Sequence, residues 1–406
     1  MQDSNQETNS ETNAVTAQIA QIIARILPEV VQTRHHLHQN PELSGQEQQT
    51  GAFVAERLRA LGVDDIQTSV AGHGVTGILR GPKNSKPAPM IALRADMDAL
   101  PIAEDSGLPY ASHCPGVMHA CGHDGHTATL LGTAAVLAEM RGHLPGPVKL
   151  IFQPAEETVG GAEAMVEAGV LEGVESIYAL HGWPNLEIGQ IGCRPGPMMA
   201  SADSFDLTIK GKGGHAAYPH LTVDPIVVGA QIISAWQTLA SREVSPLDSV
   251  VVTVTQFHAG TAYNVIPGTA HLAGTVRCLS NAVRAEMGAK MERIAKNICA
   301  AFRADCELTY VSGPPVVVND ARLNAQVEAV GRALLGPDNV TFLESPTMGA
   351  EDFAYYLLHI PGVMFRLGVG TEVSDLHTPT YNFSDGALPY GIQMFTRLAL
   401  RLGADQ

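Results

Sequence analysis

The sequence predicts an α/β protein whose discontinuous first domain carries an inserted second domain. Three observations lead to this prediction. Short apolar runs of strand length alternate with helical segments before residue 199. The order strand–helix–strand–strand–helix–strand then occupies residues 199–312, and the first pattern resumes after the Gly-Pro-Pro at 313–315. At about 150 residues per domain, the length of 406 residues predicts about two to three domains, and the hydrophobic share of 45% is ordinary for a globular core.

Residues 15–198 and 313–406 are expected to form the first domain, a mostly parallel sheet with helices on both faces. Parallel strands buried on both sides read as short, nearly continuous apolar runs. Such runs occur at 75–80, 90–95, 148–153 and 176–181. Apolar residues spaced three and four apart predict helices from Val15 to about Val30, at 46–61, at 124–140 with Asp124 as N-cap, at 161–168, and near 320–335, 350–358 and 386–402.

Residues 199–312 are expected to form an α+β domain of the ferredoxin-like type. Strands are predicted at 205–213, 249–257, 271–279 and 306–311, and helices at 223–241 and 281–303. This order is that of a split βαβ module. A sheet covered by helices on one face still has open edges, and pairing with a second copy would protect them in a two-fold dimer.

Charge and composition exclude several classes of function. The formal net charge is −16, and no cluster of Lys or Arg exceeds two in a row, so binding to nucleic acid or to an anionic membrane is not expected. The six cysteines are too few for a disulfide scaffold and indicate a reducing cytoplasm. Residues 1–14 are polar, lack the apolar core of a secretory signal and are expected to be a disordered lead-in. No run approaches the roughly 18 apolar residues that span a bilayer, so a soluble cytoplasmic protein is expected.

Metal-ligating side chains follow successive predicted strands. Cys121 and His123 lie before the helix at 124–140, Glu157 follows the strand at 148–153, and His181 ends the next strand. In a parallel sheet such positions meet at one edge. His377 is a further candidate ligand far downstream. Thiolate, imidazole and a single carboxylate suit Zn²⁺, Mn²⁺, Co²⁺ or Ni²⁺ rather than Ca²⁺ or Mg²⁺.

Glu156 and Glu157 are adjacent carboxylates just beyond a strand. Neighbouring side chains on an extended segment point to opposite sides, so the two are expected to differ in role. One can bind metal while the other faces the reacting water.

Six motifs, HACGHDGH, QPAEE, HGWP, GKGGHAAYP, YNVIP and LHTPTY, occur in this order. Together they resemble the M20 metallopeptidase family, and within it the subgroup of aminoacylases, hippurate hydrolases and auxin–amino-acid conjugate hydrolases. The resemblance extends from about residue 30 to 400. It is specific for the family and less so for the substrate.

The resemblance implies a two-metal site in the first domain. Its ligands would be Cys121, which bridges the metals, with His123, Glu157, His181 and His377. Glu156 would be the general base. Within RADMD, Asp98 matches the family's orienting carboxylate, whereas Asp96 stands where many relatives have a ligand histidine, and its role is left open.

The resemblance also assigns roles to the inserted domain, as a dimerisation and lid domain. His215 would donate a hydrogen bond to the tetrahedral oxyanion, reaching the site from the neighbouring subunit of a homodimer or higher oligomer. Asn264 and Arg277 match positions that hold the substrate's carboxylate or backbone.

The expected function is a metal-dependent amidohydrolase that cleaves N-acyl amino acids with metal-activated water. A dipeptidase or carboxypeptidase of the same family is the nearest alternative. Two other readings stay open: a hydrolase with Cys121 as nucleophile and His123 or His126 as base, and a non-catalytic zinc-binding protein. A serine hydrolase is not supported, because no G-x-S-x-G motif occurs. The acyl group, the amino-acid preference and the native metal are not determined by the sequence.

Overall fold

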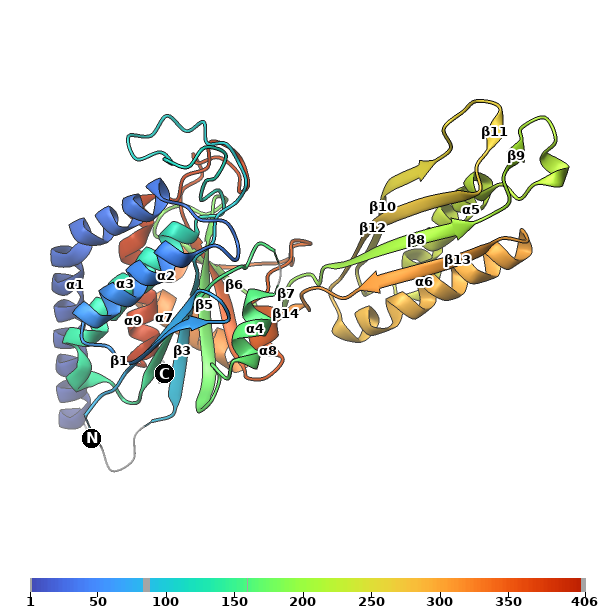
Figure 1. Cartoon of the computed structure of the whole chain (residues 1–406). Coiled ribbons are helices and arrows are strands. Elements are labelled where there is room, and N and C mark those ends of the chain that lie inside the picture. Colours follow the sequence, from blue (N-terminus) through green and yellow to red (C-terminus); the bar gives the residue numbers. More distant parts are fainter. Residues whose placement is uncertain (1, 83–87, 159, 403–406) are drawn as a thin grey trace. The chain divides into compact units, whose positions relative to one another are not determined.

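The computed structural model describes residues 2–82, 88–158 and 160–402, which form two compact units (Figure 1). Unit 1 contains the described residues of Met1–Gly196, Asn319–Glu344 and Tyr355–Gln406, and unit 2 contains Pro197–Val318 and Ser345–Ala354. The sequence assigned residues 345–354 to the first domain, and this differs from the structure. The backbone of Thr347 is hydrogen-bonded to Met198 and Ala200, which attaches this segment to unit 2.

Unit 1 is built on an eight-stranded sheet. Its strands, in spatial order, are β1 (Asp64–Val70), β2 (Gly74–Leu79), β4 (Val148–Gln153), β3 (Met90–Asp96), β5 (Val174–Trp183), β16 (Gly362–Gly368), β6 (Ile191–Cys193) and β15 (Val340–Phe342). The central strands β4, β3, β5 and β16 pair in parallel, and antiparallel pairs occur toward both edges. The predicted α/β class with a mostly parallel sheet is confirmed.

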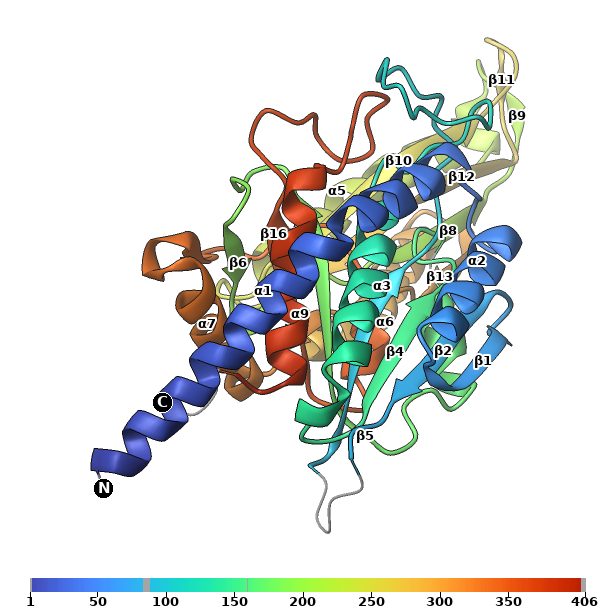
Figure 2. The ribbon, with the colours of Figure 1, turned by 90° about the vertical axis from the view of Figure 1, so that its left-hand side faces the viewer.

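Helices cover both faces of this sheet. This agrees with the burial of β4 and β16, because every residue of these two strands is buried. The helices of unit 1 are α1 (Gln2–Gln39), α2 (Gln48–Ala60), α3 (His123–Glu139), α4 (Gly161–Glu167), α7 (Ala321–Leu335), α8 (Ala354–Leu357) and α9 (Leu388–Ala399). Figures 1 and 2 show α1, α3 and α9 layered on one face, and Figure 1 shows the short α4 and α8 on the other.

Helix α1 begins at Gln2, so the expectation of a disordered lead-in over residues 1–14 is wrong for the described residues 2–14. Adding turns to an existing helix costs far less free energy than nucleating one, so the packed helix can propagate toward the N-terminus.

Residues Asn13–Gln39 of α1 form a helix that is long and apolar enough to cross a membrane. No such segment was expected from the sequence. In this structure Ile19, Ile22 and Ile23 are buried in the core of unit 1, and the helix packs against α3 and α9.

Unit 2 has the predicted ferredoxin-like order. Its elements are β7 (Gly196–Met199), β8 (Asp203–Lys210), β9 (Gly214–His215), α5 (Pro225–Thr238), β10 (Val250–Ala259), β11 (Val265–Ile266), β12 (Thr269–Cys278), α6 (Asn281–Ala301), β13 (Asp305–Val311) and β14 (Val317–Asn319). The four long strands form an antiparallel sheet in the order β10-β12-β8-β13, and α5 and α6 pack against it. Phe205 and Trp236 meet edge to face at the centre of its core.

Strand β8 alternates strictly between buried and exposed residues at its start, and this places Asp203 inside unit 2. The buried carboxylate accepts hydrogen bonds from the guanidinium of Arg284, from the Tyr310 hydroxyl and from the Gly313 backbone N–H. It therefore joins β8, α6 and the end of β13.

Asp203→Ala should destabilise unit 2 by about 3–5 kcal/mol, because it leaves the largely buried Arg284 guanidinium without its counter-charge. Urea denaturation followed by tryptophan fluorescence measures this, since Trp236 is buried in the same core. Asp206→Ala is the control on the same strand. Asp206 makes an exposed ion pair with His271, and its loss should cost about 0–1 kcal/mol. Equal losses for the two variants would contradict the role given to Asp203.

Candidate metal centre

The candidate ligands lie at the carboxyl ends of the parallel strands β4, β3 and β5. Cys121 precedes α3 and His123 is its first residue, Glu156 and Glu157 follow β4, and His181 lies near the end of β5. Parallel strands bring their carboxyl ends to one edge of a sheet, where binding sites form. These five residues lie up to 60 positions apart, and His377, which also contacts Cys121, lies 256 positions from it.

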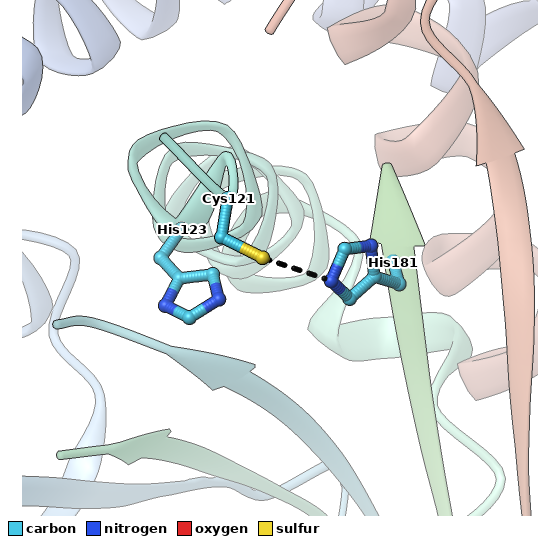
Figure 3. Close-up of side chains that lie close together, drawn as sticks. All are labelled: Cys121, His123 and His181. Atoms are coloured by element: carbon cyan, nitrogen blue, oxygen red, sulfur yellow. Dashed lines mark hydrogen bonds between the residues drawn. The ribbon is translucent and has the colours of Figure 1, made fainter. Parts of the chain in front are cut away.

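Cys121 is at the middle of the cluster. Its Sγ lies 3.5 Å from His181 Nε2 and 3.3 Å from His377 Nε2. Figure 3 shows the thiol of Cys121 pointing at the His181 ring, with His123 beside it. Cys121 belongs both to a group with His123 and His181 and to a group with Glu157 and His377. Within each group, one ligand atom per residue lies within 4.8 Å of the others.

The two glutamates take up different positions relative to this cluster. Glu157 Oε1 lies 3.4 Å from His377 Nε2 and 3.9 Å from His123 Nε2. Glu156 is buried and reaches His123 and Glu157 but is not in either group that contains Cys121. Glu157 thus belongs to one of the two candidate groups that contain Cys121, and Glu156 lies beside them.

Two residues of the site have a left-handed backbone. The φ angle is 53° at Ala155, immediately before Glu156, and 61° at His377. Such a conformation is unfavourable for residues other than glycine and is held by surrounding contacts. The Ala155 N–H donates to Glu47 Oε1 at 2.8 Å, and the His377 N–H donates to the Ala120 carbonyl at 2.8 Å. These bonds fix the loops that present Glu156 and His377.

Asp98 orients two ligands at once. Its Oδ1 accepts a hydrogen bond from His123 Nδ1 at 3.2 Å, and its Oδ2 accepts one from the Glu157 backbone N–H at 3.0 Å. Ser44 Oγ donates to the same Oδ2. Sequence reasoning placed Asp98 here through the family motif but missed Glu47 and Ser44, which no local pattern connects to the site.

The start of α3 differs from the expected one. Asp124 is not the N-cap, because the helix begins at His123 after Gly122, whose φ is 90°. Asp124 is instead fully buried and accepts hydrogen bonds from Arg34 and His38 of α1. Arg34 and His38 thus anchor the first turn of α3, which carries His123.

Four carboxylate side chains, those of Asp96, Asp98, Glu156 and Glu157, lie close to His123. Burial disfavours a protonated His123, but the charges of Asp96, Asp98 and Glu157 outweigh burial and raise its pKa to about 10. Burial, reinforced by Glu157 and Glu156, raises the pKa of the Cys121 thiol well above its usual value. Burial and the neighbouring His126 lower the pKa of His181, which keeps its imidazole neutral.

These donors fit divalent metal ions. Among the described residues, two buried ligand atoms, His123 Nε2 and Glu157 Oε1, have no hydrogen-bond partner. Buried polar atoms of this kind normally have one. The Nδ1 atoms of His123 and His181 are engaged by Asp98 and by the Gly182 carbonyl, which leaves each Nε2 for a metal. The thiol, imidazole and carboxylate set suits borderline divalent ions.

Two features of the site disfavour the hypothesis that Cys121 is a nucleophile with His126 as its base. A nucleophilic cysteine needs a lowered pKa and an available base. The pKa of Cys121 is raised, and His126 uses both ring nitrogens in hydrogen bonds to Asp96 and Gly182.

The three remaining candidates lie in unit 2. His215 on β9 pairs with Val265 on β11, and the Ala216 N–H donates to the Asn264 carbonyl at 2.9 Å, so His215 and Asn264 are neighbours. Arg277 lies at the opposite end of β12, eight residues from Thr269 and therefore roughly 27 Å away along the strand. Within unit 2 the structure brings His215 and Asn264 together and separates Arg277 from them.

Comparisons with known proteins agree with this site. The profile of peptidase family M20/M25/M40 matches residues 92–401. N-acetylcysteine deacetylase of Bacillus subtilis is 43% identical over 373 residues, covering 91% of this chain and 96% of that protein. N-acyl-L-amino acid amidohydrolase of Geobacillus stearothermophilus is 45% identical over 315 residues, covering 76% of this chain and 84% of that protein.

A solved structure is similar over the same length. The YXEP protein of Bacillus subtilis, described as a dinuclear metal binding peptidase, has a TM-score of 0.82 and 36% identity, and the match covers 94% of this chain and 99% of that one. The motifs, the sheet that gathers them and these matches agree, and the chain belongs to peptidase family M20/M25/M40.

Proposed function

We propose that this protein hydrolyses the amide bond of N-acyl amino acids at a two-metal centre. The observation that carries the proposal is the position of Cys121 in two overlapping ligand groups, with a further carboxylate, Glu156, beside them. The two relatives that act on N-acetylcysteine and N-acyl-L-amino acids support this substrate class.

The metals would be held by Cys121 as the shared ligand, with His123, His181, Glu157 and His377 around it. We propose Zn²⁺, Mn²⁺, Co²⁺ or Ni²⁺ as candidates, because thiolate and imidazole favour borderline transition metals. When bound, such ions lower the pKa of water and polarise the amide carbonyl.

Glu156 is the proposed general base. It is buried beside the ligands, and the left-handed Ala155 directly before it is held by Glu47, so its position is constrained. The Glu156 carboxylate takes a proton from the water that attacks the carbonyl carbon. It then gives that proton to the leaving nitrogen as the C–N bond breaks, which yields a carboxylic acid and a free amino acid.

Unit 2 supplies the remaining groups in this proposal. His215 donates a hydrogen bond to the developing oxyanion. Asn264 and Arg277 bind the carboxylate or backbone of the substrate, and the Arg277 guanidinium, which is only half buried, suits a planar carboxylate. Because His215 and Arg277 are at opposite ends of unit 2, we propose that one site takes these two residues from different subunits.

Strand β10 is the proposed dimer interface. It is a ten-residue edge strand, and its exposed residues include Val251 and Phe257. It has no charged residue or proline to block pairing, whereas the opposite edge, β13, carries Asp305 and Glu307. An unprotected apolar edge favours pairing with a second copy.

We further propose a reducing, cytoplasmic location. A shared thiolate ligand requires Cys121 to stay reduced, and all six cysteines are free in the described chain.

Amide hydrolysis should depend on metal. EDTA should abolish the cleavage of N-acetyl, N-benzoyl and indole-acetyl amino acids, and Mn²⁺, Co²⁺ or Zn²⁺ should restore it, as measured by release of free amino acid. Cys121→Ser should bind less metal, because a poorly ionised hydroxyl replaces a thiolate ligand. Dipeptides belong in the same panel. If they are cleaved faster than every N-acyl amino acid, the peptidase alternative is correct; full activity in metal-free protein would contradict both.

Substitution of Glu156 and substitution of Glu157 should impair the enzyme in different ways. Glu156→Gln should retain metal but lose about 10²–10⁴-fold in kcat, because the general base is gone. Glu157→Gln should reduce metal content, which elemental analysis after dialysis measures. The two variants are matched controls for each other, since they make the same chemical change at neighbouring positions. If Glu157→Gln keeps its metals and Glu156→Gln loses them, the two assignments are reversed.

Complementation tests the shared site. Glu156→Gln and His215→Ala homodimers should both be nearly inactive. After subunit exchange, a heterodimer has one site that lacks both groups and one site that lacks neither. Its activity should approach about half that of the wild-type dimer, with exchange verified by differently tagged subunits. Verified exchange without recovery would place His215 in its own subunit's site or outside catalysis.

A further inference from the structure

Asp96, whose role the sequence left open, is fully buried, and both of its carboxylate oxygens are occupied. Oδ2 accepts a hydrogen bond from Arg94 Nη1 at 2.6 Å, and Oδ1 accepts one from His126 Nδ1 at 2.7 Å. His123 Nε2 is farther away, at 3.8 Å. Asp96 is thus engaged by a cation and an imidazole of the protein itself, which sets it apart from the ligand Glu157.

His126 continues this chain of hydrogen bonds. The backbone N–H of Gly182 donates to His126 Nε2 at 2.8 Å, so that nitrogen is an acceptor and the ring proton is on Nδ1, where it is donated to Asp96. Both ring nitrogens are therefore used. His126 can serve neither as a metal ligand nor as a base while these two bonds are made.

This series of hydrogen bonds ends at His181, a proposed metal ligand. The Gly182 carbonyl accepts a hydrogen bond from His181 Nδ1 at 2.8 Å, which turns His181 Nε2 toward Cys121, 3.5 Å away. At the other end, Arg94 Nε donates to Gln153 Oε1 at 2.8 Å. Hydrogen bonds thus connect β4, β3, α3 and β5, the four elements whose ends carry the site.

We propose that Asp96 and His126 are positioning residues that orient His181 for metal binding. His126 accepts a hydrogen bond from the backbone N–H of Gly182. The carbonyl of Gly182 in turn accepts one from His181 Nδ1 and so fixes the orientation of the His181 ring. This inference rests on the proposed metal-dependent function. A ligand whose outer nitrogen is held binds metal more tightly, and loss of such an outer contact typically reduces metal affinity about 10–100-fold.

A positioning role accounts for the burial of the hydrogen-bonded polar side chains of Asp96 and His126 at this place. Apolar side chains of similar size would fill the same space without the cost of desolvating charged and polar groups. If His126 orients the ligand, its hydrogen bonds are required. If His126 only fills space, a side chain of similar volume is sufficient. The two roles predict different results for an apolar ring and for an amide at position 126.

His126→Phe and His126→Gln are the matched pair. Phenylalanine keeps a ring beside Phe383, whose centroid is 5.9 Å from that of His126, but makes neither hydrogen bond. Glutamine offers one donor and one acceptor and can bridge Asp96 and Gly182. Titration of metal-free protein with Co²⁺, followed by the visible absorption bands of the bound ion, reports affinity and ligand geometry. His126→Phe should bind Co²⁺ about 10–100-fold more weakly with altered bands, whereas His126→Gln should stay within about threefold of wild type.

Kinetics at saturating Co²⁺ adds a second readout. His126→Phe should lower kcat and leave KM within about threefold of wild type, because the chain contacts the metal ligand and not the substrate. Leu137→Ala is the control for general loosening of α3. Leu137 is buried in the same helix, eleven residues and roughly 16 Å from His126. It should lower the melting temperature without changing Co²⁺ affinity.

The outcomes separate this inference from the proposed function. If wild-type protein takes up no Co²⁺, the proposed function and the inference both fail. If wild-type protein binds Co²⁺ and His126→Phe binds it equally well with the same spectrum, only the positioning role is overturned. It is also overturned if His126→Gln is as weak as His126→Phe, or if Leu137→Ala weakens binding to the same extent.

Discussion

Unit 1 is organised around buried negative charge at the carboxyl ends of its parallel strands. Burying a carboxylate without a partner costs several kcal/mol, so each one here must be matched. Arg94 matches Asp96, and His123 lies between Asp96, Asp98 and Glu157. A divalent cation at the candidate site would add positive charge beside the carboxylates of this cluster. The ligands, their orienting residues and the strained loops can all be understood from this one requirement.

Residues outside the cluster hold several of the candidate ligands in place. Asp98 holds His123 and the backbone of Glu157, the Gly182 carbonyl holds His181, and Glu47 holds the loop before Glu156. Arg34 and His38 of α1 hold Asp124 in the first turn of α3. Left-handed residues at Ala155 and His377 persist because these surrounding contacts determine the backbone.

Unit 2 is organised differently. Its core is apolar, and the residues proposed to contact the substrate are at its ends. Phe205 and Trp236 lie in the core, whereas His215 and Arg277 are separated by most of the length of β12. The buried Asp203 joins the ends of its elements much as Asp96 does in unit 1. A small sheet with one charged edge and one apolar edge is suited to pairing on the apolar side.

The α/β class, the ferredoxin-like order of the insertion and the candidate ligands at strand ends can be predicted from the sequence alone. These depend on local periodicity and on motifs, which a few neighbouring residues are enough to define. The sequence analysis did not predict β16 (Gly362–Gly368), although this buried strand is a short apolar run like the one recognised at 148–153. It also misplaced residues 345–354, which are attached by backbone bonds to Met198 and Ala200.

The partners of the buried polar groups could not be predicted from the sequence, because they are set by how distant elements pack. Asp124 reads locally as a helix cap, but Arg34 and His38, about 90 residues earlier, engage it instead. The same holds for Asp96 with His126 and for Glu47 with Ala155. A side chain that can accept two or three hydrogen bonds has many possible donors along the chain. The packing of distant strands and helices selects among them, and no local pattern contains that choice.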